Sequence, residues 1–327
     1  MAKFLLIRFS SIGDIVLTTP VIRCLKQQVK GAEVHFLTKP SYRCLIENNP
    51  YIDVLHLLDS NLSDTIRELK KENFDYLIDL HHNLRTFVIK QRLGVLSFSF
   101  NKINFRKFLL TAFKINCLPR QHIVDRYLDT LRLFDVKNDG QGLDYFIPEK
   151  DKIVVKNFLS PSHHAGYVAF AIGAQHATKK LFPEKIVKIL IGMKKPVVLL
   201  GGDEDRKWGE EIVQKAGSLV FNACGRCNLN QSASLIEQAN VVITPDTGLM
   251  HIAAAFKKKI VSVWGNTVPE FGMSPYGAHP DSLIVEVKGL PCRPCSKLGY
   301  EKCPRGHFKC IKEIPDEVII DFVEKNF

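Results

Sequence analysis

The sequence predicts an α/β protein built from two doubly wound domains, each with a parallel sheet. Short apolar runs rich in β-branched and aromatic residues alternate with amphipathic stretches of helical length, which is the pattern of βα units. This rhythm breaks over Val136–Lys150, where Gly, Asn, Asp and Pro accumulate, and then restarts. The length of 327 residues also suits two domains of about 150 residues each. In such folds ligands bind at the carboxyl ends of the strands, so we expect a site in a cleft between the two domains.

In the first half the pattern predicts five strands, at Lys3–Phe9, Glu33–Thr38, Val54–Leu58, Tyr76–Leu80 and Val95–Phe100. Helices are predicted between and after them, at Ile15–Lys30, Asn61–Glu72 and Ile123–Phe134. We therefore place the first domain at residues 1–150, with the interdomain linker at its end.

The second half repeats the alternation, and we place the second domain at residues 151–312. Its strands are predicted at Gly166–Ile172, Pro196–Leu200, Leu219–Asn222, Val241–Thr244 and Ile260–Trp264. Its helices are predicted at Pro183–Met193, Asp205–Ala216, Gln231–Gln238 and Gly248–Phe256. A loop-rich segment with several cysteines follows from Thr267 to Ile311. A final helix, Asp316–Phe327, begins after Pro315 and lies in a third segment, residues 313–327.

Composition excludes several classes of protein. Hydrophobic residues make up 46% and charged residues 24%, so the chain is neither disordered nor fibrous. No apolar run reaches the roughly 18 residues of a membrane helix, and the apolar stretch before Arg8 is too short for a secretory signal. We therefore expect a cytoplasmic protein whose nine cysteines are mostly reduced.

The charge is strongly positive and unevenly distributed. The formal net charge is +11, which favours an anionic partner without choosing among nucleic acid, membrane and phosphorylated substrate. Between Asp79 and Asp125 there is no acidic residue, whereas eight cations occur there: Arg85, Lys90, Arg92, Lys102, Arg106, Lys107, Lys114 and Arg120. This basic window predicts an anion-facing surface; a basic helix pair without a ligand is the alternative.

Three motifs stand at strand-to-helix junctions. In the first, Gly13 permits the tight turn after the first strand and Asp14 opens the next helix, which is also ordinary N-cap chemistry. In the second, Thr178 and Lys180 precede a helix that begins at Pro183, a place suited to a phosphate, although a solvated lysine pair explains the sequence equally well.

The third motif comprises Asp246, Thr247, Gly248 and His251. The unpaired N–H groups and dipole of a helix start attract anions there, while Asp246 also suits a helix cap and His251 a core position. No dinucleotide fingerprint or P-loop occurs. Asp203, Glu204 and Asp205 resemble a metal-binding D-x-D motif, but we interpret them as acidic residues that complement a helix dipole.

A cysteine cluster lies near the C-terminus. Its spacing is C-x2-C-x7-C-x3-H-x2-C, formed by Cys292, Cys295, Cys303, His307 and Cys310. Four thiols and a histidine in nineteen residues match structural zinc chemistry, but the spacing is not that of a standard zinc finger. Structural zinc, disulfides and reduced thiols therefore all remain open.

Taken together and in this order, the motifs resemble the lipopolysaccharide heptosyltransferases, glycosyltransferase family 9, which use ADP-heptose. The matching segments are SSIGDIVLTTP at 10–20, IDLHHNLR at 78–85, HIVDRY at 122–127, TKKLFP at 178–183 and PDTGLMH at 245–251. Phe182 stands where many members carry Trp. The resemblance implies a GT-B fold, in which two Rossmann-like domains face each other across a cleft and the C-terminal helix returns to the first domain.

The resemblance also implies residue roles. Asp14 matches the proposed general base and Lys180 the lysine that binds the donor phosphates, and both are predicted to be catalytic. Donor binding is predicted for Thr178, Lys180, Asp246, Thr247, Gly248 and His251. Acceptor binding is predicted for Ser11, Gly13, Asn83, Arg85 and Arg126. Because lysine and a helix start can stabilise the leaving diphosphate, no metal is expected in catalysis.

The implied activity is inverting transfer of heptose from ADP-heptose to the Kdo/heptose inner core of lipopolysaccharide. The expected partners are a nucleotide-sugar donor, an anionic lipid-linked core oligosaccharide and the anionic face of the inner membrane, which the enzyme would contact peripherally. Two alternatives remain: a GT-B transferase or epimerase that uses another nucleotide sugar, and a nucleic-acid-binding protein. The second lacks the recognised motifs, so we expect no nucleic acid partner.

Overall fold

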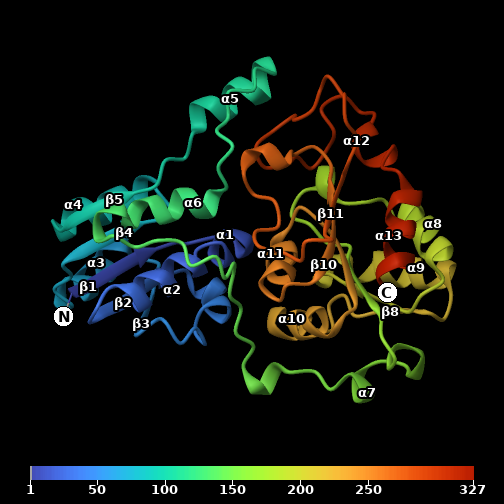
Figure 1. Cartoon of the computed structure of the whole chain (residues 1–327), viewed down its shortest axis with the longest axis horizontal. Helices are drawn as coiled ribbons and strands as arrows, with labels where there is room; N and C mark the ends of the chain where they lie inside the picture. Colours follow the sequence, from blue (N-terminus) through green and yellow to red (C-terminus); the bar gives the residue numbers. More distant parts are fainter. Residues whose placement is uncertain (1) are drawn as a thin grey trace. The chain divides into compact units, whose positions relative to one another are not determined.

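The computed structural model describes residues 2–327, which divide into two compact units. The first unit contains residues 2–102 and 121–146, and the second contains 103–120 and 147–327. Each is built on one parallel sheet with helices packed on it (Figure 1). Across these residues no helix is both long and apolar enough to span a bilayer.

The first unit contains a five-stranded sheet in the order β3-β2-β1-β4-β5, all parallel. Its strands are β1 Ala2–Ile7, β2 Ala32–Thr38, β3 Val54–Leu57, β4 Tyr76–Asp79 and β5 Leu96–Ser99. Its helices are α1 Ile12–Val16, α2 Thr19–Gln28, α3 Leu62–Lys71, α4 Leu84–Leu93 and α6 Ile123–Leu128. These strands match the sequence expectation to within two residues at every end.

Alternation along the strands supplies the two buried faces of this sheet. Leu5 and Ile7 of β1 pack in a cluster with Ile66 of α3 and Ile89 of α4. Phe4 faces the other side, where its ring lies 5.1 Å from that of Phe134. Both faces are therefore covered, as a parallel sheet requires.

One predicted helix is two helices in the structure. We expected Ile15–Lys30 to be continuous, but α1 ends at Val16 and α2 begins at Thr19. Pro20 lacks the N–H that would bond back along the helix, and its ring would clash with the carbonyl of Val16. The proline therefore occupies the first turn of a new helix, where that N–H is not needed.

The second unit contains a six-stranded parallel sheet in the order β11-β10-β9-β6-β7-β8. Its strands are β6 Val168–Ala171, β7 Val197–Leu200, β8 Val220–Asn222, β9 Val241–Pro245, β10 Lys259–Trp264 and β11 Leu283–Glu286. Its helices are α5 Asn104–Phe113, α7 Val155–Phe158, α8 Pro183–Met193, α9 Arg206–Ala216, α10 Leu229–Gln238, α11 Gly248–Ala255, α12 Lys309–Lys312 and α13 Asp316–Asn326. β11 was missed because it lies in the segment we interpreted as loop.

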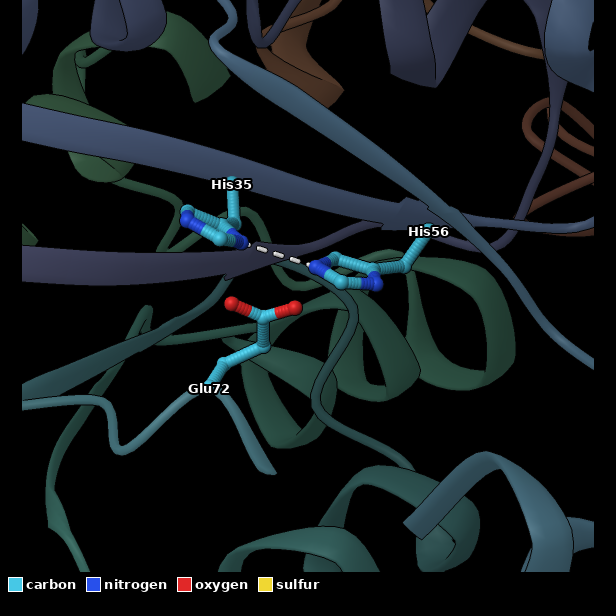
Figure 2. Close-up of side chains that lie close together, drawn as sticks. All are labelled: His35, His56 and Glu72. Atoms are coloured by element: carbon cyan, nitrogen blue, oxygen red, sulfur yellow. Dashed lines mark hydrogen bonds between the residues drawn. The ribbon is translucent and has the colours of Figure 1, made fainter. Parts of the chain in front are cut away.

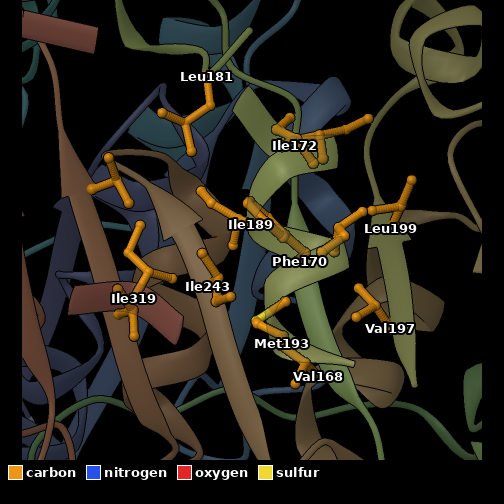
Figure 3. Packing of buried hydrophobic residues seen from close by; sticks show 14 of the residues in the cluster. Val168, Phe170, Ile172, Leu181, Ile189, Met193, Val197, Leu199, Ile243 and Ile319 are labelled. Carbon is orange, nitrogen blue, oxygen red and sulfur yellow. The ribbon is translucent and has the colours of Figure 1, made fainter. Parts of the chain in front are cut away.

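The C-terminal helix corrects one expectation. α13 belongs to the second unit, whereas the family resemblance implied that it returns to the first domain. Ile319 of α13 is fully buried in the core cluster of the second sheet, to which β6, β9 and α8 also contribute residues (Figure 3). Asp316 pairs with Lys185 and Lys188 of α8 at 2.6 and 2.8 Å, which anchors the start of α13 on α8.

The unit boundaries also differ from the expected division at residue 150. Residues 103–120 belong to the second unit because Leu110 of α5 buries against Val268 and Phe271. Residues 136–146, part of the expected linker, belong to the first unit. There Arg23, only 1% exposed, pairs with Asp139 at 2.7 Å and also with Asp144. These ion pairs hold the segment to α2.

Candidate active site

Apart from Arg126 on α6, the candidate site residues of the first unit follow β1 and β4, the pair of strands at which the strand order reverses. Carboxyl ends of parallel strands meet at one edge of a sheet, and ligands of open α/β sheets bind where the order reverses. Asp14 comes after β1 and His81 after β4, and Ile7 pairs with Asp79 at the ends of these strands. The topology therefore brings these predicted segments to one edge.

Asp14 is held in place by an arginine and a serine. Its Oδ1 lies 2.5 Å from Nη2 of Arg8, and its Oδ2 accepts hydrogen bonds from Ser11 Oγ at 2.7 Å and Ser11 N at 3.2 Å. The Asp14 side chain is 20% exposed, so solvent or a ligand can still reach it. The structure thus places the predicted base in a fixed orientation at the edge of the sheet.

Arg8 is the partner of Asp14 that the sequence reasoning missed. It is buried and also donates to the Leu80 carbonyl at 2.5 Å and to the Tyr127 hydroxyl at 3.0 Å. Burial alone would lower the pKa of Arg8, but the charge and hydrogen bond of Asp14, together with Tyr127 and Asp79, outweigh it and raise that pKa. The signal was an arginine at the end of an apolar strand, six residues before an aspartate.

His81 adds a neutral imidazole to the same edge. Its ring lies 4.9 Å from the Phe9 ring, and its buried Nδ1 has no hydrogen-bond partner. Burial lowers the pKa of His81 to about 4, and the positive charges of Arg8 and Lys102 add to the effect. A neutral ring with an unused nitrogen can exchange a hydrogen bond with a bound hydroxyl group.

The predicted acceptor residues have different surroundings. Gly13 is buried in α1, and the Asn83 side chain accepts from Thr86 N at 3.0 Å, which caps α4. Arg126 is 4% exposed and donates to the Asn101 carbonyl at 3.2 Å, whereas Arg85 is exposed on α4. Acceptor binding by these residues and Ser11 stays a prediction. In the structure Asn83 serves as the N-cap of α4.

In the second unit the strand order reverses between β6 and β9. The loop after β6 carries both Lys179 and Lys180, and it stands between the ends of two neighbouring strands, β9 and β7. Each lysine pairs with a carboxylate from a different neighbour. At this edge each of the two lysines is therefore neutralised and held in place by a carboxylate.

Lys180 forms its pair on the β7 side. Its Nζ lies 2.6 Å from Oδ1 of Asp205, which is 2% exposed, and 5.5 Å from the centre of the Trp208 ring. A Cβ at Gly173 would come within 2.2 Å of Asp205 Oδ2, so only glycine allows this carboxylate its position. Asp205 is therefore the residue that positions Lys180, a role that the sequence did not reveal.

Lys179 forms its pair on the β9 side. Its Nζ lies 2.6 Å from Asp246 Oδ2, which also accepts a hydrogen bond from Thr267 Oγ1 at 2.8 Å. Asp246 therefore does not cap the following helix: Thr247 is the N-cap residue of α11, and its Oγ1 lies 3.2 Å from Thr244 Oγ1. Gly248 then begins α11 at the same edge.

The remaining donor residues are buried. Thr178 Oγ1 donates to the Tyr300 carbonyl at 3.1 Å and accepts from Tyr300 N at 2.8 Å. This exchange ties the lysine loop to the segment between Cys295 and Cys303, so the Thr178 hydroxyl holds the loop in place. His251 is 2% exposed on α11. Ligand contacts of Thr178 and His251 stay predictions.

The cysteine cluster borders a cavity of about 530 Å³ in the second unit, lined by Lys114, Cys292, Cys295, Tyr300 and His307 among others. Cys292 Sγ lies 3.7 Å from His307 Nε2, and all nine cysteines are free thiols. Burial raises the pKa of the Cys295 and Cys310 thiols to about 11. These thiols are protonated at neutral pH, and zinc binding by the cluster stays a prediction.

Residues 63–300 match the family model described as glycosyltransferase family 9 (heptosyltransferase). The chain belongs to this family. Lipopolysaccharide heptosyltransferase 1 of Campylobacter coli is 22% identical over 99% of both chains. A family 9 glycosyltransferase structure from Veillonella parvula matches with a TM-score of 0.78 and 21% identity over 99% of this chain and 96% of that one.

The E. coli ADP-heptose LPS heptosyltransferase II structure matches with a TM-score of 0.75 and 19% identity, over 99% of this chain and 98% of that one. These similarities confirm the predicted GT-B fold, and the family 9 match confirms that the chain is a glycosyltransferase. The residues at the two sheet edges described above are therefore the candidate active-site residues of a family 9 enzyme.

The depressed pKa of His81 predicts an acid sensitivity that its replacement relieves. The unfolded chain takes up a proton at His81 below about pH 6.5, whereas the folded chain does so only near pH 4. Folded-state stability is therefore lost through His81 as the pH falls from 6.5 towards 4. We expect the melting temperature of His81→Gln to fall less between pH 7 and pH 5 than that of the wild type. His279→Gln, at a partly exposed histidine, is the control; equal falls in wild type and His81→Gln would contradict the assignment.

Proposed function

We propose that this glycosyltransferase transfers heptose from ADP-heptose to the Kdo/heptose inner core of lipopolysaccharide, with inversion at the anomeric carbon. The observation that carries the proposal is that each unit holds charged groups at the carboxyl edge of its own sheet: a fixed carboxylate in the first unit and two fixed lysines in the second. The names of the relatives support the substrates: one is a lipopolysaccharide heptosyltransferase and another an ADP-heptose enzyme.

On the acceptor side, Asp14 acts as the general base. Its Oδ2 accepts the proton of the acceptor hydroxyl as that oxygen forms a bond to the anomeric carbon of the heptose. The bond from that carbon to the diphosphate breaks on the opposite face, and its electron pair leaves with ADP. Arg8 and Ser11 keep the carboxylate oriented.

On the donor side, Lys180 and the start of α11 stabilise the diphosphate. Negative charge accumulates on the leaving group, and an ammonium group together with N–H groups at Thr247 and Gly248 compensates it. Lys180 is held by Asp205 before the donor binds, so it needs little ordering when it turns to a phosphate oxygen. The Lys179–Asp246–Thr267 contacts hold the adjoining turn in shape.

The reaction proposed here needs no metal ion. Divalent ions that assist nucleotide-sugar transfer neutralise the leaving diphosphate, and here Lys180 and α11 perform that task. Asp205 and Asp246 are the carboxylates that follow the neighbouring strands at this edge, and each forms an ion pair with a lysine.

The basic window supports contact with an anionic acceptor and membrane surface. Arg85 is exposed on α4 of the first unit, and Arg106 is exposed on α5 of the second. Phe105, Phe108 and Phe113 of α5 are 72%, 51% and 62% exposed, so basic and aromatic side chains occur together on this helix. This combination suits an interface helix on anionic lipid. We propose peripheral binding to the cytoplasmic face of the inner membrane.

The first prediction tests the base. Asp14→Asn keeps the size of the side chain but removes the proton acceptor, so turnover should fall by roughly two to four orders of magnitude. The ADP-induced rise in melting temperature should be unchanged because ADP binds through the second unit. Asp64→Asn, at an exposed aspartate of α3, is the matched control. Turnover of Asp14→Asn close to that of the wild type would remove Asp14 from this role.

The second prediction tests the donor. Of ADP, UDP, GDP and CMP, only ADP should raise the melting temperature; saturation at 100 times its Kd adds about 2.7 kcal/mol to stability. Lys180→Met should weaken that effect and lower the transfer rate, whereas Lys156→Met, at an exposed lysine, should do neither. A rise with UDP or GDP alone would replace the heptose donor by another nucleotide sugar. Full ADP binding by Lys180→Met would contradict the role of Lys180.

The third prediction tests the membrane surface. Arg106→Glu with Phe105→Ser should weaken cosedimentation with phosphatidylglycerol vesicles and leave the ADP-induced melting shift unchanged. Lys107 is left intact because its Nζ lies over the Phe271 ring at 5.7 Å. Arg67→Glu, exposed on α3 outside the basic window, is the control. Unchanged vesicle binding by the α5 variant would contradict the proposal.

A further inference from the structure

Two histidines and a glutamate converge in the first unit, away from the residues that the proposed reaction uses. His35 lies on β2, His56 on β3 and Glu72 directly after α3. One potential ligand atom from each lies within 4.8 Å of the other two, and no other such group of three or more His, Cys, Asp or Glu residues occurs among residues 2–327. Figure 2 shows a nitrogen of each ring facing the other, with the Glu72 carboxylate directed toward both.

The position of the cluster separates it from the reaction. His35 lies inside the sheet, paired with Leu5 of β1, on the face covered by α3. Glu72 follows α3 and precedes β4, so it lies toward the amino ends of the strands, whereas Asp14 follows the carboxyl end of β1. Nothing in the proposed transfer requires these three side chains.

A carboxylate behind His35 orients its ring. The Nε2 atom of His35 lies 2.9 Å from Glu33 Oε1, so Nε2 carries the proton and donates it to that carboxylate. The Nδ1 lone pair then faces His56 Nε2, 2.8 Å away. A histidine that donates one N–H to a carboxylate and offers its other nitrogen is the usual arrangement behind a metal ligand, because the carboxylate fixes the tautomer.

His56 is also suited to bind a cation. Burial lowers the pKa of His56, which disfavours the protonated ring. Transfer of its proton from Nε2 to Nδ1 leaves Nε2 free as a second nitrogen ligand. The Phe74 ring lies 5.0 Å from the His35 ring and 6.1 Å from the His56 ring, edge-on to both, which restricts their rotation.

We propose that His35 Nδ1, His56 Nε2 and the Glu72 carboxylate form a binding site for a divalent ion of the zinc type. Two imidazole nitrogens and one carboxylate oxygen are the donor set that zinc and cobalt accept, and water can fill the fourth position. The ion would connect β2, β3 and the end of α3. It would therefore stabilise the first unit.

The Lys3 ammonium competes with an ion for the carboxylates of this site. Its ammonium group lies 3.3 Å from Glu33 and 3.5 Å from Glu72, so it carries the positive charge that the two carboxylates need when no ion is bound. An ion at Glu72 has to displace or approach this charge. Removal of the Lys3 ammonium should therefore favour the ion and disfavour the protein without it.

The test is cobalt titration of the whole chain after its thiols have been alkylated. Alkylation prevents binding by the Cys292–Cys310 cluster. One Co²⁺ per chain should bind, with a visible spectrum that lacks thiolate charge-transfer bands, and Zn²⁺ should displace it and raise the melting temperature. His56→Gln should abolish binding, whereas His279→Gln should bind like the wild type. Glu72→Gln, on a partly exposed side chain, is the second variant if His56→Gln does not fold.

Lys3→Met separates a metal site from a purely structural cluster. If the three residues bind the ion, Lys3→Met should bind Co²⁺ on the order of tenfold more tightly, from the lost repulsion between the ammonium and the ion. If the cluster is only structural, Lys3→Met will be less stable and its affinity for Co²⁺ will not rise. That result, or cobalt binding by His56→Gln and Glu72→Gln equal to that of the wild type, would overturn the proposal.

Discussion

Parallel strands carry their carboxyl ends at one edge of a sheet, and nearly every candidate site residue of this protein depends on that constraint. In each unit the strand order reverses beside the first strand, so the helices after neighbouring strands lie on opposite faces. The loops at that point are left uncovered. Asp14 and His81 meet in the first unit for this reason, as do the lysine loop and Asp246 in the second.

The charged groups at these edges are paired before any substrate binds. Arg8 with Asp14, Lys180 with Asp205 and Lys179 with Asp246 are each within 2.6 Å and largely shielded from water. Removing such charges from water is costly, so a partly buried ion pair adds little to stability unless further hydrogen bonds satisfy it. Its value here is orientation, since a group already held in place loses little entropy when the reaction needs it.

The strands of both sheets were predictable from sequence because buried parallel strands are short, apolar and β-branched. Local patterns failed where distant residues decide the structure. β11 pairs with β10 although its segment reads as loop, and residues 103–120 join the second unit through Leu110 and Phe271. α13 packs on α8, where Gly192 admits Ile320; a Cβ at Gly192 would come within 2.4 Å of Ile320 Cδ1. Periodicity shows that a helix has an apolar face but does not show which surface receives it.

By itself, the sequence determined the α/β class, the positions of the strand-to-helix junctions and the family, because these depend on local pattern and on motifs at fixed spacing. It also singled out Asp14 and Lys180 as candidate catalytic residues. Only the tertiary structure decided which partner each of these side chains takes. Arg8 and Asp205 were identified as the partners of Asp14 and Lys180, and His35, His56 and Glu72 were brought together from separate elements. Side-chain contacts between residues far apart in the chain follow from strand order and register, which no short stretch of sequence encodes.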